Sequence, residues 1–232
     1  MNPKFISFEG IDYCGKSTQI KKLEEFLNER DIPNFVGIEP GSTALGGTLR
    51  RVLKRPDYVY ALMNEGFKDD PNFPEIPLEQ KRTNEAETLL FLAARAEFVE
   101  HIVEPKIKDN ISVLADRFID STVAYQGGGR WESDREIVAL INKLNNFVTR
   151  GRIPDLTFLL SIDYATMIER SEGKRKDYME SLGPRFYNGV IIQYGNIADR
   201  NPERIVKIDG KQNPEKIFES EILPRVKKLY GI

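Results

Sequence analysis

The chain has 232 residues, of which 40% are hydrophobic and 30% charged, close to the average of globular proteins. This composition excludes collagen-like, low-complexity and disordered classes, and the length suits one α/β domain with a substantial core. Lysine and arginine total 34 against 36 aspartate and glutamate, so the net charge of -2 provides no general attraction to nucleic acid or anionic lipid. We therefore expect one domain over residues 1–232 and no nucleic-acid partner.

The sequence also argues against a membrane or export role. The longest uninterrupted apolar run, residues 89–94, is far shorter than the roughly 20 residues that cross a bilayer. The start MNPKFISFEG lacks a signal-peptide pattern. The single cysteine, Cys14, excludes an internal disulfide and suits a reducing compartment. We expect a cytoplasmic protein with no membrane partner.

Strand and helix patterns alternate along the chain. Residues 4–8 form an apolar run typical of a buried strand, and a glycine-containing turn separates them from a helical pattern over residues 17–30. Further strands are expected at residues 35–38, 111–115, 156–162 and 205–208, and further helices at residues 44–53, 85–107, 137–148 and 214–229. This alternation predicts an α/β fold with a parallel sheet of about five strands flanked by helices.

Two segments interrupt the alternation. Residues 55–81 contain Pro56, Pro71, Pro74 and Pro77, and their composition indicates an inserted irregular segment. Residues 172–184 are polar and charged between two glycines, which suits either a solvated loop or a mobile lid. Composition alone favours the solvated loop.

A phosphate-binding motif follows the first expected strand. Residues 10–17, GIDYCGKS, match G-x-x-x-x-G-K-[ST] between a strand and a helix, the context that the motif requires. Backbone N–H groups of such a loop surround phosphate oxygens, Lys16 reaches the β- and γ-phosphates, and the Ser17 hydroxyl binds Mg²⁺. The expected nucleotide-binding residues are Gly10, Ile11, Asp12, Tyr13, Cys14, Gly15, Lys16, Ser17 and Thr18. The motif alone leaves open a kinase, a GTPase switch or a motor.

An aspartate and an arginine follow the third expected strand. The N-K-x-D motif that reads guanine in GTPase switches is absent from the sequence, which disfavours that class. Asp116 and Arg117 stand at the carboxyl end of a strand, where open parallel sheets bind ligands. The aspartate can support Mg²⁺ through water, and the arginine can clamp a phosphate, although a plain surface ion pair is the alternative.

Several phrases of the sequence together resemble the thymidylate kinase family. FEGIDYCGKSTQ, EPGSTALGGTLR, FLAAR, DRFIDSTVAYQGGGR and IPDLTFLLSID occur in that family's order and spacing, over nearly the whole chain except residues 55–81. The resemblance implies a P-loop kinase fold with a lid at residues 172–184. It also implies transfer of the γ-phosphate of ATP to dTMP, giving dTDP for dTTP synthesis, with Mg²⁺ as cofactor and a homodimer as the assembly.

The resemblance further implies roles for single residues. Asp12 would accept a hydrogen bond from the 3′-OH of the deoxyribose, and Arg117 would hold the dTMP phosphate. Phe91 would stack on thymine, and Arg95, one helical turn later, would donate to thymine O4. Further substrate contacts are implied for Arg50, Ser121, Tyr125 and Gln126. The bulk of the tyrosine would crowd a 2′-OH.

The chain departs from the family pattern at its cations. Ile38 and Ser42 replace an arginine and a glycine of the family's R-E-P-G-G-T, so one cation near the acceptor phosphate is missing. Tyr13 occupies the position where eukaryotic-type members place a P-loop arginine, so the lid must supply that charge. The family's lid motif D-R-x-E lacks its arginine at residues 177–180, and Arg175 or Lys176 is expected to replace it. The catalytic set is therefore expected to be Asp12, Lys16, Arg117, Arg175 and Lys176.

Two other functions remain open at this point. A kinase for another pyrimidine monophosphate, dUMP or UMP, would share every feature except the base and sugar contacts. A nucleotide-binding regulatory protein without turnover would share the binding motifs but release no ADP.

Overall fold

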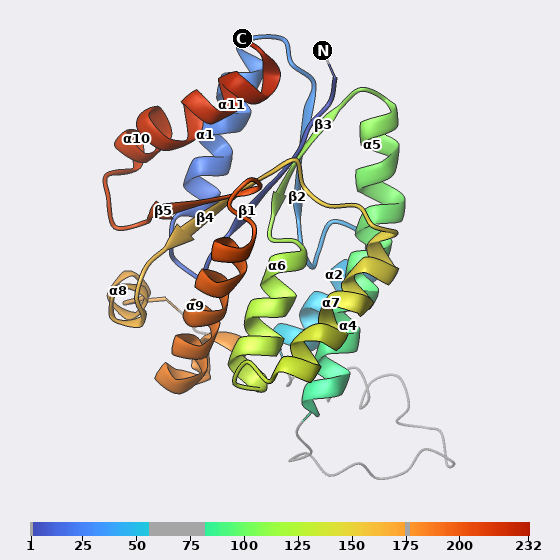
Figure 1. Cartoon of the computed structure of the whole chain (residues 1–232), viewed down its shortest axis with the longest axis vertical. Coiled ribbons are helices and arrows are strands. Elements are labelled where there is room, and N and C mark those ends of the chain that lie inside the picture. Colours follow the sequence, from blue (N-terminus) through green and yellow to red (C-terminus); the bar gives the residue numbers. More distant parts are fainter. Residues whose placement is uncertain (1, 56–81, 175–176) are drawn as a thin grey trace.

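A computed structural model describes residues 2–55, 82–174 and 177–232. All strands of its sheet are parallel and follow the order β2-β3-β1-β4-β5. The strands are β1 (Phe5–Glu9), β2 (Asn34–Ile38), β3 (Ser112–Asp116), β4 (Leu156–Ser161) and β5 (Ile205–Asp209). The predicted α/β class and five-stranded parallel sheet are confirmed. Because β1 lies at the centre, the loop that follows it opens in the middle of the carboxyl edge of the sheet (Figure 1).

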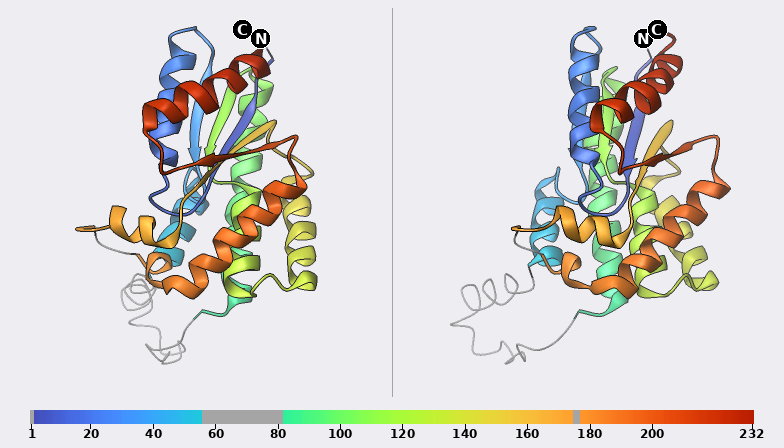
Figure 2. Two further views of the ribbon diagram at one scale, coloured as in Figure 1. Left: turned by 60° about the vertical axis from the view of Figure 1, so that its left-hand side comes forward. Right: turned by 90° about the vertical axis from the view of Figure 1, so that its left-hand side faces the viewer.

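Helices cover both faces of the sheet (Figures 1 and 2). The α-helices are α1 (Lys16–Asn28), α2 (Ala44–Lys54), α4 (Asn84–Phe98), α5 (Glu104–Lys108), α6 (Ile119–Thr122), α7 (Arg135–Thr149), α8 (Tyr164–Arg170), α9 (Gly183–Arg200), α10 (Pro214–Ile217) and α11 (Leu223–Tyr230). Three π-helical segments, η1 (Val99–Val103), η2 (Val123–Arg130) and η4 (Phe218–Ile222), continue α4, α6 and α10, and η3 (Met179–Ser181) is a 3₁₀ turn. Among the described residues, no helix has the length and apolarity needed to cross a membrane.

The alternation of side chains along β1 explains why both faces are buried. Phe5 packs with Phe98 and Val103 of the α4–η1 helix, whereas Ile6 and Phe8 belong to the larger cluster that includes α1. Successive strand residues point to opposite faces, so β1 needs apolar cover on each. The helix expected at residues 85–107 is the continuous run α4–η1–α5, and the one expected at 214–229 is α10–η4–α11.

Between the lid and β5 the structure contains α9, a helix that was not predicted from the sequence. Phe186, Val190, Tyr194 and Ile197 recur on its buried face at helical spacing, so a signal was present. It was obscured by the polar lid before it and by glycines within it. The inserted segment, apart from Arg55, and the predicted lid cations Arg175 and Lys176 lie outside the described residues.

Glycines allow α9 to approach η2 at backbone distance. A Cβ at Gly189 would stand 2.5 Å from the carbonyl oxygen of Gly128, and a Cβ at Gly128 would stand 2.6 Å from the carbonyl oxygen of Gly189. Neither contact can be relieved by moving a flexible side chain. This close packing fixes η2, whose residues Tyr125 and Gln126 line a cavity at the carboxyl edge of the sheet.

Substitution of Gly189 tests the packing of α9 on η2. Gly189→Ala should lower the free energy of unfolding by about 1 to 3 kcal/mol because the added methyl group overpacks two backbones. Gly195→Ala in the same helix is the matched control, since no heavy atom lies within 4 Å of its Cβ position. The control should be neutral or more stable by up to about 1 kcal/mol, as alanine favours helix. Equal effects of the two variants in urea denaturation would contradict this account.

Candidate active site

The phosphate loop is shaped by two glycines with positive φ. Gly10 has φ +131°, and a Cβ there would lie 2.3 Å from the carbonyl oxygen of Leu160 on β4. Gly15, with φ +103°, stands immediately before α1. The Lys16 ammonium is almost fully buried and donates to the carbonyl oxygens of Gly10 (3.2 Å) and Ile11 (3.0 Å). The loop therefore holds a cation at a helix N-terminus, an arrangement suited to phosphate.

A cavity of about 800 Å³ extends along the carboxyl edge of the sheet from this loop. It brings together most of the residues predicted from the sequence, namely Asp12, Tyr13, Cys14, Gly15, Lys16, Ser17, Thr18, Arg50, Phe91, Asp116, Arg117, Ser121, Tyr125 and Gln126. Gly10, Ile11 and Arg95 were also predicted but are not among its lining residues. Gly10 and Ile11 support the loop from behind through their carbonyl oxygens.

Arg117 joins the end of β3 to the phosphate loop. Its Nη2 donates to Asp12 Oδ1 and to the Tyr125 hydroxyl, both at 2.9 Å, and its Nη1 donates to the Gly10 carbonyl oxygen at 2.7 Å. The hydroxyls of Tyr125 (3.1 Å) and Tyr187 (3.2 Å) donate to Asp12 Oδ2. Burial opposes ionisation of Asp12, but the Arg117 charge and a smaller Lys16 contribution hold its pKa well below its usual range. Asp12 is thus an ionised acceptor on the cavity wall.

Two carboxylates lie side by side at the ends of β2 and β3. The Glu39 N–H donates to the backbone oxygen of Asp116 at 3.1 Å, and both side chains line the cavity together with Ser17. Among the described atoms, Asp116 Oδ1 and Glu39 Oε1 are buried without a hydrogen-bond partner. Buried oxygens of this kind suit a divalent cation, and Mg²⁺ needs only one or two protein carboxylates beside phosphate oxygens. The residues present therefore fit Mg²⁺.

The guanidinium group of Arg95 is bound entirely by protein acceptors in the structure. Its Nε and Nη2 donate to Glu39 Oε2, and its remaining N–H groups donate to Thr122 Oγ1, Asn145 Oδ1 and the Phe118 carbonyl oxygen, all within 2.9 Å. An arginine has five N–H donors, so all of them are engaged. The contact with thymine O4 stays a prediction, and it would require one of these bonds to be given up.

Cations from the lid side also reach the cavity. The Tyr13 hydroxyl donates to Glu180 Oε2 at 3.1 Å, and the Lys174 ammonium lies 4.5 Å from the centre of the Tyr13 ring. Arg170 donates to the carbonyl oxygens of Tyr13 (3.2 Å) and Gly210 (3.0 Å). Arg170 and Lys174 both line the cavity. The described part of the lid region therefore supplies positive charge beside the phosphate loop.

Sequence reasoning missed Lys54 and Glu39 as cavity residues. Lys54 is four residues after Arg50 on α2 and so shares its helix face, a signal that could have identified it. It pairs with Asp177 at 2.7 Å and thereby connects α2 to the lid. Glu39 stands in the stretch that resembles the family's R-E-P-G-G-T, but its position beside Asp116 depends on the pairing of β2 with β3.

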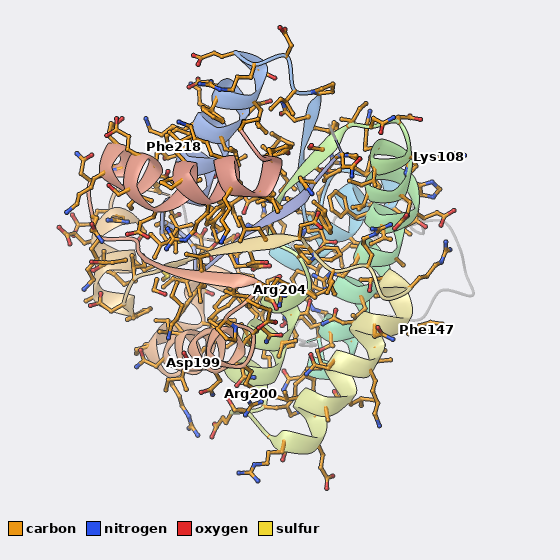
Figure 3. All side chains as sticks on the ribbon, turned by 45° about the horizontal axis from the view of Figure 1, so that its top comes forward. Lys108, Phe147, Asp199, Arg200, Arg204 and Phe218 are labelled. Atoms are coloured by element: carbon orange, nitrogen blue, oxygen red, sulfur yellow. The ribbon has the colours of Figure 1, made fainter. Side chains whose placement is uncertain are left out.

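A second buried carboxyl group precedes the phosphate loop. Glu9 Oε1 accepts a hydrogen bond from the Phe118 N–H at 2.7 Å, and Oε2 accepts one from the Tyr194 hydroxyl at 2.8 Å. Burial and the nearby Asp120 raise the pKa of Glu9 to about 8, against the opposing charge of Arg117. Asp120 is itself paired with Arg204 at 2.8 Å, near the start of β5 (Figure 3).

Comparisons with known proteins agree on one family. The sequence profile described as thymidylate kinase matches residues 8–63 and 74–222. A thymidylate kinase of Fervidobacterium nodosum is 37% identical over 213 residues, covering 92% of this chain and 93% of its own length. One of Kosmotoga olearia is 38% identical over 230 residues, covering 97% and 98%. The crystal structure of thymidylate kinase from Ehrlichia chaffeensis is similar with a TM-score of 0.69 and 29% identity, covering 99% of this chain and 100% of that one.

The raised pKa of Glu9 predicts a pH dependence of stability. The unfolded chain releases this proton near its ordinary pKa of 4.5, whereas the folded chain retains it up to about pH 8. The contribution of Glu9 to stability is therefore full below pH 4.5, decreases as pH rises to 8, and is lost above it. Glu9→Gln should remove this decrease, so its stability relative to the parent should improve between pH 5 and 8. Parallel stability curves for the two proteins across this window would refute the assignment.

Proposed function

The chain belongs to the thymidylate kinase family, and we propose that its cavity binds ATP and dTMP together, with the two phosphates meeting between Lys16 and Arg117. The protein is an ATP-dependent phosphotransferase that converts dTMP to dTDP. The observation that carries the proposed arrangement is a single cavity lined by the phosphate loop, by Arg117 with Asp12, and by Phe91. A dUMP or UMP kinase and a regulator without turnover are the less favoured alternatives.

We place ATP on the side of the phosphate loop. Backbone N–H groups of residues 13–18 and the Lys16 ammonium would hold its phosphates. The loop after β5 adjoins this region, because a Cβ at Gly210 would lie 3.0 Å from the Cys14 carbonyl oxygen. Gln212 and Pro214 line the cavity just beyond, and we assign them to the adenine end.

We place dTMP between α4, η2 and the end of β3. Asp12, an ionised acceptor, would receive the hydrogen bond of the 3′-OH, and Arg117 would contact the phosphate. Phe91 offers a ring for stacking on the base. The further contacts that we propose come from Arg50, Ser121, Tyr125 and Gln126, all of which line the same cavity.

Phosphoryl transfer needs alignment and charge neutralisation more than it needs a nucleophilic side chain. The acceptor phosphate is already an anion, so no protein base is required. Lys16 would stabilise charge on the transferred group, with Arg170 and Lys174 approaching from the lid side and Arg175 or Lys176 as the predicted lid cation. Ser17 and Asp116 would hold Mg²⁺, which when bound neutralises phosphate charge.

We also propose a homodimer in which α4 and α7 form the interface. These two helices pack against each other, yet Leu89 on α4 and Leu140 and Phe147 on α7 are 56%, 50% and 78% exposed. Figure 3 shows Phe147 at the outer side of α7. Leu140 and Phe147 are seven residues apart and so share one helix face. A two-fold axis would pair this surface with its own copy. The cytoplasm remains the proposed location, consistent with the single, buried Cys14.

Charge placed on the α7 surface tests the dimer. Phe147→Asp should shift the solution mass measured by light scattering from about twice the chain mass to 26.6 kDa. Ile192→Asp on α9 is the matched control, because Ile192 is also exposed (61%) but lies on another helix. The control should remain a dimer. A monomeric parent protein, or a dimer that survives Phe147→Asp, would exclude this interface.

Lys16→Met tests the phosphate loop. The fold should persist because methionine fills a similar space, while turnover of dTMP with MgATP should fall by more than about 100-fold. A coupled ADP-release assay measures turnover, and circular dichroism checks the fold. Activity above about a tenth of the parent value would remove Lys16 from the proposed role.

A further inference from the structure

Glu87 of α4 forms a buried ionic cluster behind the cavity. Arg130 donates to both of its carboxylate oxygens, from Nε at 2.9 Å and from Nη2 at 2.6 Å. Arg82 donates to Oε2 at 3.3 Å. Gln126 donates from Nε2 to Oε1 at 3.1 Å. Glu87 is 2% exposed, so these side chains are its environment.

The charge state of Glu87 determines which end of the Gln126 amide can face it. Burial alone would raise the pKa of Glu87, but the hydrogen bonds and charge of Arg130 outweigh burial and lower it. The carboxylate therefore stays ionised and can only accept hydrogen bonds. Gln126 must present its NH₂ group to Glu87, since the opposite orientation would set its carbonyl oxygen against a carboxylate.

Because the Gln126 nitrogen is bound to Glu87, the Gln126 carbonyl oxygen is left to accept a hydrogen bond from a ligand in the cavity. Gln126 lines the cavity, and no residue in the described part of the chain donates a hydrogen bond to its Oε1. Gln126 and Phe91, whose ring is proposed to stack on the base, line the same cavity. Glu87, which holds the amide nitrogen of Gln126, is one helical turn before Phe91 on α4. The cavity thus presents a fixed acceptor on the base side.

The hydrogen-bond donors of dTMP indicate which group can bind to the Gln126 carbonyl oxygen. A bound pyrimidine nucleotide with a deoxyribose has few donors: thymine and uracil carry an N3–H, and the sugar carries its 3′-OH. The 3′-OH is assigned to the Asp12 carboxylate, which leaves N3–H for Gln126. Cytosine has an unprotonated acceptor at N3, so it would set two acceptors against each other.

We propose that Glu87 is a positioning residue that fixes the Gln126 carbonyl toward the base, so that the site accepts pyrimidines with an N3–H and rejects cytosine. This inference rests on the proposed placement of dTMP. It gives the site a means of base selection even while every N–H donor of Arg95 is engaged by Glu39, Thr122 and other protein acceptors.

The Glu87→Gln variant tests the orientation directly. Its amide carbonyl can still accept from Arg130, while its NH₂ would face Gln126 and draw the Gln126 carbonyl inward, away from the base. The ratio of kcat/KM for dTMP to that for dCMP should then fall by about 3- to 10-fold. The change should arise from a higher KM for dTMP and better use of dCMP, with kcat for dTMP nearly unchanged.

Arg82→Met is the matched control, because it disturbs the same ionic cluster but leaves the bond between Glu87 and Gln126. It should lower thermal stability and keep the dTMP to dCMP ratio within about twofold. If Arg82→Met lowers the ratio as much as Glu87→Gln does, Glu87 has only a structural role and the proposal is overturned. An unchanged ratio in a folded Glu87→Gln protein overturns it as well.

Gln126→Met provides a second test that does not depend on the folding of Glu87→Gln. Methionine keeps the length of the side chain and removes its acceptor, so the ratio should again fall by about 3- to 10-fold. An unchanged ratio in this variant overturns the proposal. Failure of the parent protein to phosphorylate dTMP would instead reject the proposed function, so the two failures are distinguishable.

Discussion

The bond between Arg117 and Asp12 is the interaction on which the site depends. It connects the end of β3 to the loop after β1, and Arg117 reaches the Gly10 carbonyl oxygen with its other nitrogen. The hydroxyls of Tyr125 from η2 and Tyr187 from α9 complete the surroundings of Asp12. Four separate elements thus meet at one carboxylate. The geometry of the acceptor site therefore depends on the packing of η2 and α9 as much as on the sheet.

Two carboxyl groups near the end of β1 show how environment decides charge. Burial opposes ionisation of both groups. At Asp12 the charges of Arg117 and Lys16 outweigh burial and keep the group ionised, whereas at Glu9, three residues earlier, burial together with Asp120 outweighs Arg117 and raises the pKa to about 8. The ionised group lines the cavity and can accept from a ligand. The protonated group lies behind the loop and bonds to the Phe118 N–H and the Tyr194 hydroxyl. Asp12 is therefore available to bind a ligand, whereas Glu9 stabilises the fold.

Local patterns in the sequence were sufficient for the sheet and the phosphate loop. Each strand is a short apolar run, and residues 10–17 carry the glycines and the lysine in adjacent positions, so their geometry follows from local sequence. The partners of charged side chains could not be predicted in this way. For Arg95 the sequence predicts a contact with the ligand, which stays a prediction, but it does not reveal the protein partners Glu39 and Asn145, both 50 or more residues away along the chain. Such partners are set by strand order and helix packing, which periodicity does not reveal.

A crystal structure with dTMP and a non-hydrolysable ATP analogue would show directly how the cavity binds its two nucleotides. We expect the triphosphate at Lys16, the dTMP phosphate within hydrogen-bonding distance of Arg117, and the thymine ring against Phe91. A dTMP base beside Gln212 and Pro214, or an acceptor phosphate away from Arg117, would contradict the proposed arrangement.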